Sequence, residues 1–220
     1  MAKKQKILET ATKLFMQEGY GRVSMDQVTR ESLVSKATVY AYFKNKNELF
    51  VASLTYYQEL HQVKAPVFKS KPAKSLDDLY FGVQDYSQQA YDYYNTDAIV
   101  NMYRILIAEI NEFPELFEMF FGNHVGITKT LSDFVVAFAR ENNYNEDNCY
   151  ILACQILDLV RGATIWTKLV KNPDKLKLFE NQNIMPENIV KSIEGLIKLH
   201  LLTTHEGKEY EKSTNFNRLY

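Results

Sequence analysis

The amino-acid sequence predicts an all-α protein with an N-terminal domain of three helices and a larger C-terminal helical domain. Apolar residues recur at helical spacing along most of the 220 residues, and they nowhere alternate with polar residues for long enough to indicate a strand. The five prolines all lie between these helix-period stretches, where proline is tolerated. No Asn-Gly or Asp-Gly pair predicts a hairpin.

The first helix is predicted over residues 3–18. Its apolar residues lie on one stripe, so the helix is expected to bury one face. Gly19 stands in the position where a glycine usually ends a helix. The stripe consists of Ile7, Leu8, Ala11, Leu14 and Phe15.

Two short helices and a longer one follow. Ser24 is the predicted N-cap of the first, Ser35 caps a helix over 36–43, and Asn45 begins a long helix over about 46–63. Ser24 and Asn45 are each followed three residues later by Gln or Glu, the pattern of a capping box. A turn of about three residues between two short helices is typical of a helix-turn-helix.

Residues 64–75 are polar and contain two prolines, which is typical of a domain boundary. We therefore expect a helix-turn-helix domain over 1–48 that continues into the helix 46–63, a second domain over 64–204, and a polar tail over 205–220. The second domain is predicted to hold helices near 76–94, 97–112, 115–142, 146–171 and 187–204, with Ser75 and Asn145 as plausible N-caps.

Charge is distributed unevenly between the two predicted domains. Residues 1–48 carry nine Lys and Arg against five Asp and Glu, a net charge of +4, whereas the remainder carries 17 against 22, a net charge of −5. A basic head on an acidic body indicates that the head meets an anionic partner and that the body does not.

Cys149 and Cys154 are the two cysteines of the chain, so a disulfide scaffold is excluded and a reducing compartment fits. They lie five residues apart on one predicted helix and therefore make a poor metal pair. No run of about 18 uncharged apolar residues predicts a membrane span. Charged residues interrupt any apolar signal region near the start. We expect a cytoplasmic protein with no membrane partner, no metal and no cofactor.

The predicted helix 36–43 carries the most informative surface. Val39 and Phe43 share one face, presumed to be the core face. Small side chains allow close approach to a major groove, hydroxyls bond to base edges or phosphates, and lysine neutralises a phosphate. Lys46 and Ser24 stand at helix starts, which also favour phosphate. The outward residues of this helix are Lys36, Ala37, Thr38, Tyr40 and Ala41. Taken singly, each of them, like Ser24 and Lys46, could be an ordinary cap or solvated residue.

The same stretch closely resembles the DNA-binding domain of the TetR family of bacterial transcriptional regulators. The resemblance rests on Gly19-Tyr20, on Ser24, on the run Val34-Ser-Lys-Ala-Thr-Val-Tyr-Ala-Tyr-Phe43, and on Lys46-Asn-Glu-Leu-Phe50. One position departs from the family pattern, because Leu33 replaces the glycine that eases a turn with positive φ. More loosely, residues 104–121 resemble the AcrR-type branch.

The resemblance implies specific DNA contacts. Ala37 would approach bases. The residues that would contact DNA chiefly through phosphates are Lys36, Thr38, Tyr40, Tyr42 and Lys46. The full predicted set is Ser24, Ser35, Lys36, Ala37, Thr38, Tyr40, Tyr42 and Lys46.

The second domain is rich in aromatic residues, a composition that can line a ligand cavity. Polar residues inside its apolar runs are a sharper indication of such a cavity: Arg104, Glu109, His124, Asp158 and Arg161. Asp158 and Arg161 could also simply pair on one helix face. Plain core packing of the aromatic residues and a structural role for the histidine remain open. The candidate ligand contacts are Tyr103, Phe117, Phe121, His124 and Trp166.

A homodimer is expected, because one helix-turn-helix unit alone binds DNA weakly and a two-fold pair meets two half-sites. The last two long helices are the predicted dimer face, forming a four-helix bundle with their copies. An internal core position is the alternative for each residue. The predicted interface consists of Ile151, Cys154, Leu157, Ile189, Ile193, Leu196, Ile197 and Leu201.

The resemblance implies a DNA-binding transcriptional regulator, expected to be a repressor that a small apolar or aromatic ligand releases from its double-stranded operator. An all-α enzyme is disfavoured, because the sequence shows no nucleophile motif, metal-spaced ligand set or Gly-rich phosphate loop. The alternative is a non-regulatory DNA-binding module of the nucleoid or cell-division type, which would have a filled C-terminal core.

Overall fold

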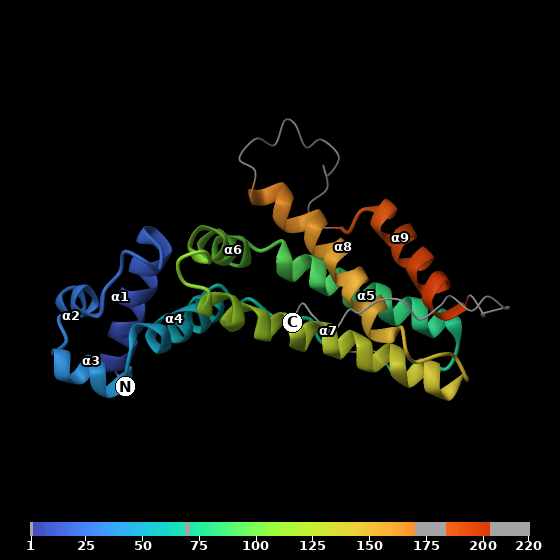
Figure 1. Ribbon diagram of the computed structural model, residues 1–220, viewed down its shortest axis with the longest axis horizontal. Helices are drawn as coiled ribbons and strands as arrows, with labels where there is room; N and C mark the ends of the chain where they lie inside the picture. Colours follow the sequence, from blue (N-terminus) through green and yellow to red (C-terminus); the bar gives the residue numbers. More distant parts are fainter. Residues whose placement is uncertain (1, 69–70, 170–183, 203–220) are drawn as a thin grey trace.

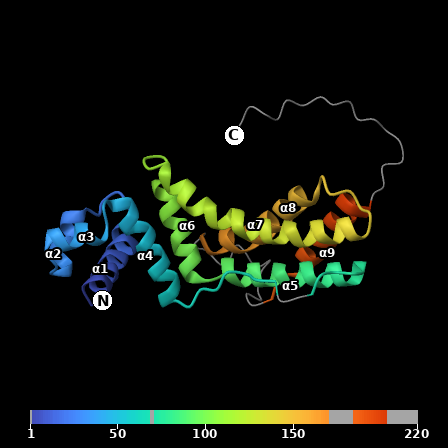
Figure 2. The same cartoon turned by 90° about the horizontal axis from the view of Figure 1, so that it is seen from below.

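The computed structural model describes residues 2–68, 71–169 and 184–202, and the regular structure within these ranges is entirely helical, as predicted. Figures 1 and 2 show α1–α3 at one end of an elongated molecule, with α4 and α6 next to them and α5, α7 and α8 extending away. The helices are α1 (Ala2–Glu18), α2 (Met25–Ser32), α3 (Lys36–Tyr42), α4 (Lys46–Leu60), α5 (Leu76–Tyr94), α6 (Asp97–Glu109), α7 (Glu115–Glu141), α8 (Cys149–Leu169) and α9 (Glu187–Ile197).

The head has its own aromatic core, and α1 packs along α4. Phe15 and Phe50 are completely buried, and their ring centroids lie 4.8 Å apart in an edge-to-face arrangement. The Tyr20 ring meets Phe50 at 4.9 Å. Because α4 also contacts α6, one continuous helix joins the head to the body.

The body is built around α8, which packs against α5, α7 and α9. The side chains of Leu152, Ile156 and Val160 are fully buried in it. By length and composition alone α8 could cross a membrane, yet half of its most apolar window is buried within the protein. A core helix passes the same test, so α8 does not indicate a membrane protein.

The predicted N-caps are partly right. The Ser24 hydroxyl accepts from the Gln27 N–H at 3.1 Å, but the Gln27 side chain donates to Glu18 rather than reaching back, so no capping box forms. Asn45 accepts from the Glu48 N–H at 2.8 Å, and the Glu48 carboxylate accepts from the N–H of the residue before Asn45. Both residues therefore cap their helices as predicted, whereas the Gln27 and Glu48 side chains have partners that the spacing did not predict.

Some helix ends in the body differ from the predicted ones, and α6 ends at Glu109 rather than 112. Helix α8 begins at Cys149 rather than 146, because the Asn145 side chain accepts from the Asp147 N–H at 2.9 Å and holds a turn before the helix. Helix α9 ends at Ile197 and continues as a π-helical segment, Lys198–Leu202. The predicted tail 205–220 lies outside the described residues.

Candidate DNA interface and ligand cavity

Helix α3 presents to solvent the side that the sequence predicts. Val39 and Phe43 are buried in the head, whereas Ala37, Tyr40 and Tyr42 are exposed. Ser24 and Ser35, the two N-caps, are also exposed. The head therefore offers an accessible surface of the size and chemistry that a DNA groove accepts.

Intramolecular contacts hold the polar side chains of this surface. The Ser35 hydroxyl accepts from the Thr38 N–H and lies 2.8 Å from the Thr38 hydroxyl. Lys36 Nζ lies 2.6 Å from Asp26, and this carboxylate raises the pKa of the lysine. Both partners of the pair are largely exposed, so exchanging Asp26 for a phosphate would cost little free energy.

Lys46 is turned toward the body rather than outward. Its ammonium donates to the Gly21 carbonyl at 3.2 Å and lies 4.1 Å from the Tyr20 ring centroid and 5.5 Å from that of Phe113. The predicted phosphate contact would require Nζ to leave these rings. The sequence pattern alone could not reveal this position, because Phe113 belongs to the body.

The turn between α2 and α3 holds Leu33 in the left-handed region, at φ 55° and ψ 30°. The Leu33 side chain is 82% exposed, so it makes little packing that could offset the backbone strain. The chain therefore adopts the positive-φ turn even though a leucine stands in the glycine position.

We expect Leu33→Gly to be more stable than Leu33→Ala by about 1 kcal/mol, because alanine keeps the Cβ that is strained in the left-handed region. In an ordinary helix interior the order would be reversed. Urea unfolding of the two variants measures the difference. Equal stability, or a more stable alanine variant, would contradict a strained turn.

A cavity of about 490 Å³ lies between α6, α7 and α8. Tyr103, Phe117 and Trp166 line it, which places three of the five predicted ligand contacts together. His124 lines a smaller adjoining cavity of about 20 Å³, whose wall also includes Tyr103. The side chain of Phe121 lies outside the described part of the chain.

The sequence analysis missed the aliphatic part of the large cavity. Leu106, Ile107 and Ile110 follow Tyr103 at intervals of three, four and seven residues, so one face of α6 forms this wall. That spacing was visible in the sequence, but it is also the spacing of an ordinary buried face. Gly162 and Ile165 complete the wall from α8.

His124 is the centre of a polar cluster between the two cavities. Arg161 Nη1 lies 3.1 Å from Nε2, and the Tyr103 hydroxyl contacts the same nitrogen. Because the guanidinium can only donate, Nε2 accepts and the ring proton lies on Nδ1, which donates to the Tyr94 oxygen at 2.9 Å. Arg161 also pairs with Asp158, as the sequence allowed.

Burial, and then the charge of Arg161, lower the pKa of His124 to about 4. Burial raises the pKa of Tyr103 to about 12. At neutral pH the histidine is therefore uncharged and the phenol keeps its proton. The guanidinium carries the positive charge of the cluster.

The lowered pKa of His124 predicts a pH-dependent stability. The unfolded chain takes up this proton near pH 6.5 and the folded chain near pH 4, so the stabilisation is complete above 6.5 and is lost as the pH falls toward 4. Between about pH 7.5 and about pH 5, His124 alone is expected to lower the free energy of unfolding by about 2 kcal/mol.

Urea unfolding at the two pH values, at fixed protomer concentration, measures this difference. His124→Gln keeps an acceptor for Arg161 but cannot titrate, and it should remove that part of the pH dependence. An unchanged pH dependence in the variant would contradict the assignment.

The predicted dimer residues divide into two groups. Ile151 is exposed on α8, while Cys154 and Leu196 are half-buried. The other five are buried inside the protomer, where α9 packs its apolar stripe against α8. The buried five are Leu157, Ile189, Ile193, Ile197 and Leu201.

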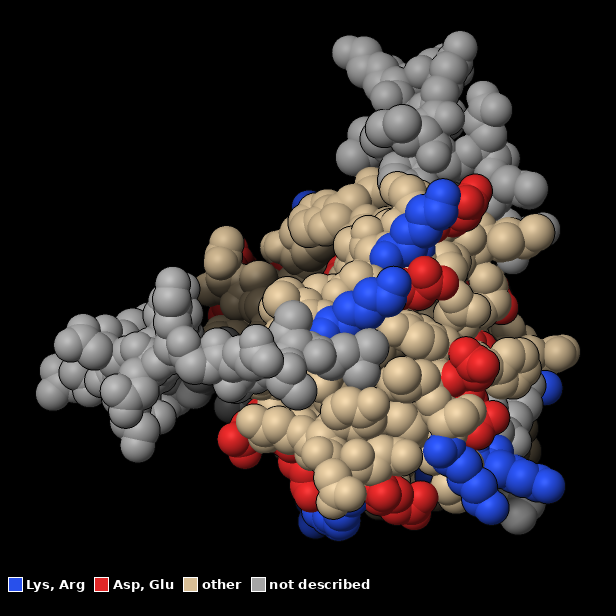
Figure 3. All heavy atoms as spheres, turned by 90° about the vertical axis from the view of Figure 1, so that its right-hand side faces the viewer, with Lys and Arg blue, Asp and Glu red and all other residues tan. Residues whose placement is uncertain are grey.

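The end of the body opposite the head carries mixed charge. Figure 3 shows Lys and Arg beside Asp and Glu across this face. In the body, Lys191 pairs with Glu187 at 2.6 Å and Arg140 with Glu146 at 2.7 Å. Among the described residues, no group of three or more His, Cys, Asp or Glu could hold a metal ion.

Comparison with known proteins identifies both regions of the chain. Residues 7–53 match the family described as bacterial regulatory proteins of the tetR family. Residues 82–189 match the C-terminal domain of AefR-like transcriptional repressors. The C-terminal match is thus to an AefR-like domain, and the AcrR-type branch stays a prediction.

Similar proteins have the same organisation. The HTH-type transcriptional regulator YxaF of Bacillus subtilis is 25% identical over 185 residues, 81% of this chain and 92% of YxaF. Over 60 and 48 residues, YuxN and YhgD of B. subtilis are 42% and 52% identical, but these matches span only 21% and 25% of their lengths. The structure of the Flavonoid-responsive Regulator FrrA is 27% identical, with a TM-score of 0.66 over 90% of this chain and 95% of FrrA.

These relatives are DNA-binding regulators of transcription, and by family the chain is a regulator rather than an enzyme. The comparisons give no support to a non-regulatory DNA-binding module. The chain belongs to the TetR family of bacterial helix-turn-helix transcriptional regulators.

Proposed function

We propose that the chain is a homodimeric, cytoplasmic repressor that leaves its operator when a small aromatic ligand fills the 490 Å³ cavity. One observation carries this proposal: α6 lines the cavity with one part of its surface and contacts the head with another. A cavity of this volume also argues against a filled, purely structural core.

The contact between α6 and the head is close and polar. Glu109, the last residue of α6, accepts from the Gly21 N–H at 3.2 Å. A Cβ on Gly19 would come within 2.4 Å of the same carboxylate, and one on Gly21 within 2.9 Å. Glycine at both positions lets the head approach the end of α6. Ile110, the next residue, lines the cavity.

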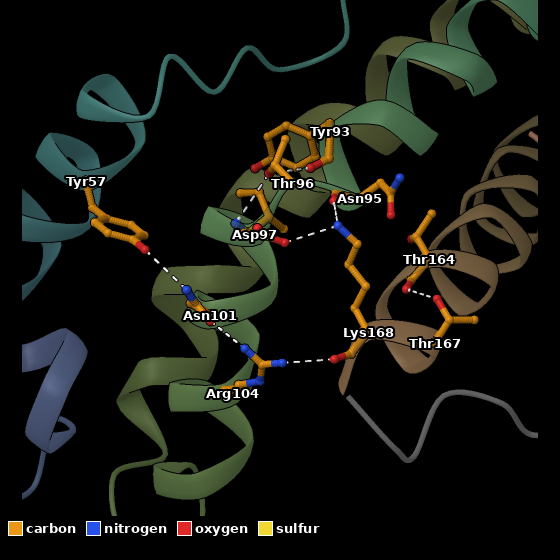
Figure 4. A network of polar contacts seen from close by, with 11 residues as sticks. Tyr57, Tyr93, Asn95, Thr96, Asp97, Asn101, Arg104, Thr164, Thr167 and Lys168 are labelled. Atoms are coloured by element: carbon orange, nitrogen blue, oxygen red, sulfur yellow. Dashed lines mark hydrogen bonds and ion pairs between the residues drawn. The ribbon is translucent and has the colours of Figure 1, made fainter. Parts of the chain in front are cut away.

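A second set of contacts joins α4 to α8 through α6 (Figure 4). Asn101 donates to the Tyr57 hydroxyl of α4 at 3.3 Å and accepts from Arg104 at 2.5 Å. Arg104 also donates to the Lys168 carbonyl at the end of α8, at 2.9 Å. Lys168 Nζ in turn lies 3.1 Å from Asp97 at the start of α6. A shift of α6 would therefore be transmitted to the helix that carries the head.

The ligand must favour one of two arrangements of α6. If it binds more tightly to the arrangement in which the heads no longer fit successive grooves, it releases DNA, and without such a difference in affinity it changes nothing. Two similarities support this reading. The C-terminal match is to AefR-like repressors, and the name of FrrA states that it responds to flavonoids, which are planar aromatic molecules.

The dimer face proposed here is the solvent-exposed side of α8 and α9. Ile151 of α8 and Leu199 of the π-helical segment after α9 are exposed, and a Cβ on Gly195 would meet no atom within 4 Å. Helices can pair closely across such a surface, with Cys154 and Leu196 at its edge. We also include in the proposed DNA contacts all eight predicted residues of the head, with Lys46 reaching phosphate after leaving Tyr20.

Fluorescence anisotropy with a labelled duplex from the region upstream of the chain's own gene tests the proposal. We expect nanomolar binding of a dimer, much weaker binding of a scrambled duplex, and release by a flavonoid such as quercetin or by another planar aromatic compound. Equal affinity for both duplexes would contradict an operator-specific regulator. No release by any compound of an aromatic panel would contradict control by an aromatic ligand.

A further inference from the structure

The charged side chains that line the large cavity differ in how far they are exposed to solvent. Among the described lining residues they are Asp158 and Arg161, both of α8. The Asp158 side chain is 66% exposed, whereas that of Arg161 is 26% exposed. The cation therefore faces the interior, and its carboxylate partner lies at the mouth, in water.

The Arg161 guanidinium is poorly neutralised on its inner side. There it contacts His124 Nε2, an uncharged acceptor, and lies near the uncharged Tyr103 phenol. Asp158 itself is largely exposed, so water can solvate its carboxylate when another anion takes its place beside the guanidinium. A guanidinium presents a planar fork of N–H donors that matches two oxygens of a carboxylate.

The remaining wall is apolar and aromatic. Phe117 and Trp166 contribute rings from α7 and α8, and Leu106, Ile107 and Ile165 contribute aliphatic side chains. Such a wall favours rings, while one inward-facing cation favours a negative charge on them. The guanidinium would repel an aromatic cation, and a neutral ring would offer it no anionic oxygen in addition to Asp158.

We propose that Arg161 recognises an ionised oxygen on an aromatic ligand, a carboxylate or an ionised phenol, while Phe117 and Trp166 pack against its rings. This proposal rests on the proposed function, because it names the chemistry of the ligand that would fill the regulatory cavity. The oxygen replaces Asp158 as the partner of the guanidinium, and the Asp158 carboxylate turns to solvent.

Trp166 supplies a direct measurement of binding, since it is the single tryptophan of the chain and lines the cavity. Its emission, excited at the red edge where tyrosine does not absorb, is followed during titration of the full-length protein. The probes are para-tert-butylbenzoate as a carboxylate, pentafluorophenol as a phenol ionised at neutral pH, and methyl para-tert-butylbenzoate as the neutral form.

We expect at least one of the two anions to bind about tenfold to a hundredfold more tightly than the ester. The carboxylate and phenolate arms show which source of the ionised oxygen is preferred. Equal affinity for the ester and both anions would overturn the proposal, as would the absence of any change in Trp166 emission at millimolar probe.

Variants of Arg161 distinguish recognition of the anionic ligand from a structural role of this side chain. Arg161→Gln should lose the preference for the anion while keeping its affinity for the ester, and Arg161→Lys, which keeps the charge without the fork, should be intermediate. Arg140→Gln is the matched control, because Arg140 is exposed at the end of α7, pairs with Glu146 and does not line the cavity. This variant should keep the full preference.

An equal loss of affinity for acid and ester in Arg161→Gln would overturn the proposal in favour of a structural role. None of these titrations contains DNA. A negative result would therefore not contradict operator release, which the anisotropy experiment tests separately.

Discussion

Ala37→Glu is expected to weaken binding of the upstream duplex by at least about 100-fold. The Ala37 side chain is exposed on α3, where the DNA would lie, so the new carboxylate would stand against phosphates and base edges. Facing like charges cost several kcal/mol, and a dimer would carry the change twice. Anisotropy titration of the labelled duplex at constant salt measures the loss.

Folding should not be affected by this substitution. Ala37 lies in the first turn of α3, where a negative charge favours the helix, and it makes no buried contact. Ala137→Glu is the matched control, because it places the same side chain on an exposed position of α7 in the body. We expect the control to bind as the unmodified protein does. A folded Ala37→Glu protein with unchanged affinity would show that α3 does not meet the DNA.

Phe50→Ala is expected to lower the free energy of unfolding of the head by about 3–5 kcal/mol. Phe50 is completely buried on α4 and packs edge to face against Phe15 and Tyr20. Removing the ring leaves a cavity at the point where α4 joins the head, and the surrounding rings can fill it only in part. Urea unfolding followed by circular dichroism, at fixed protomer concentration, measures the change.

Phe81→Ala is the matched control, because its ring is 67% exposed on α5. We expect this control to change the free energy of unfolding by less than about 0.5 kcal/mol. Operator binding should weaken in Phe50→Ala in proportion to the fraction of unfolded head. A loss of similar size in both variants would mean that the aromatic core of the head does not determine its stability.

Local features of the head could be predicted from the sequence because they depend on near neighbours. Ser24, Ser35 and Asn45 are N-caps in the structure, as their spacing indicates, and Val39 and Phe43 turn inward. Each cap depends on contacts within four residues along the chain, and the inward face of α3 follows from the helical period. Leu33 also adopts the positive φ that the resemblance implies, because the turn is fixed by the helices on both sides.

The dimer face could not be predicted in the same way. Ile193 and Ile197 form an apolar stripe, and periodicity shows that such a stripe is buried without showing against what. In the structure it is buried against the protomer's own α8. The exposed side of α9 is less apolar, so the pattern marked the side of the helix that packs within the protomer.

Polar contacts between residues far apart in the sequence could not be predicted either. Lys46 lies over the ring of Phe113, which is 67 positions away in the sequence, and Arg161 contacts His124, which is 37 positions away. The sequence marked Arg161 and His124 as polar residues inside apolar runs, and Lys46 as a residue at a helix start. Their partners depend on how α6, α7 and α8 pack, which no local pattern encodes.

Hydroxyl-radical footprinting of the upstream duplex tests most directly whether two copies of the α3 surface lie on one double helix. We expect two protected patches on the same face of the duplex, one helical turn or a whole number of turns apart, and their loss with Ala37→Glu. Protection spread evenly along the duplex, or patches on opposite faces that persist in Ala37→Glu, would contradict DNA recognition by a symmetric pair of α3 helices.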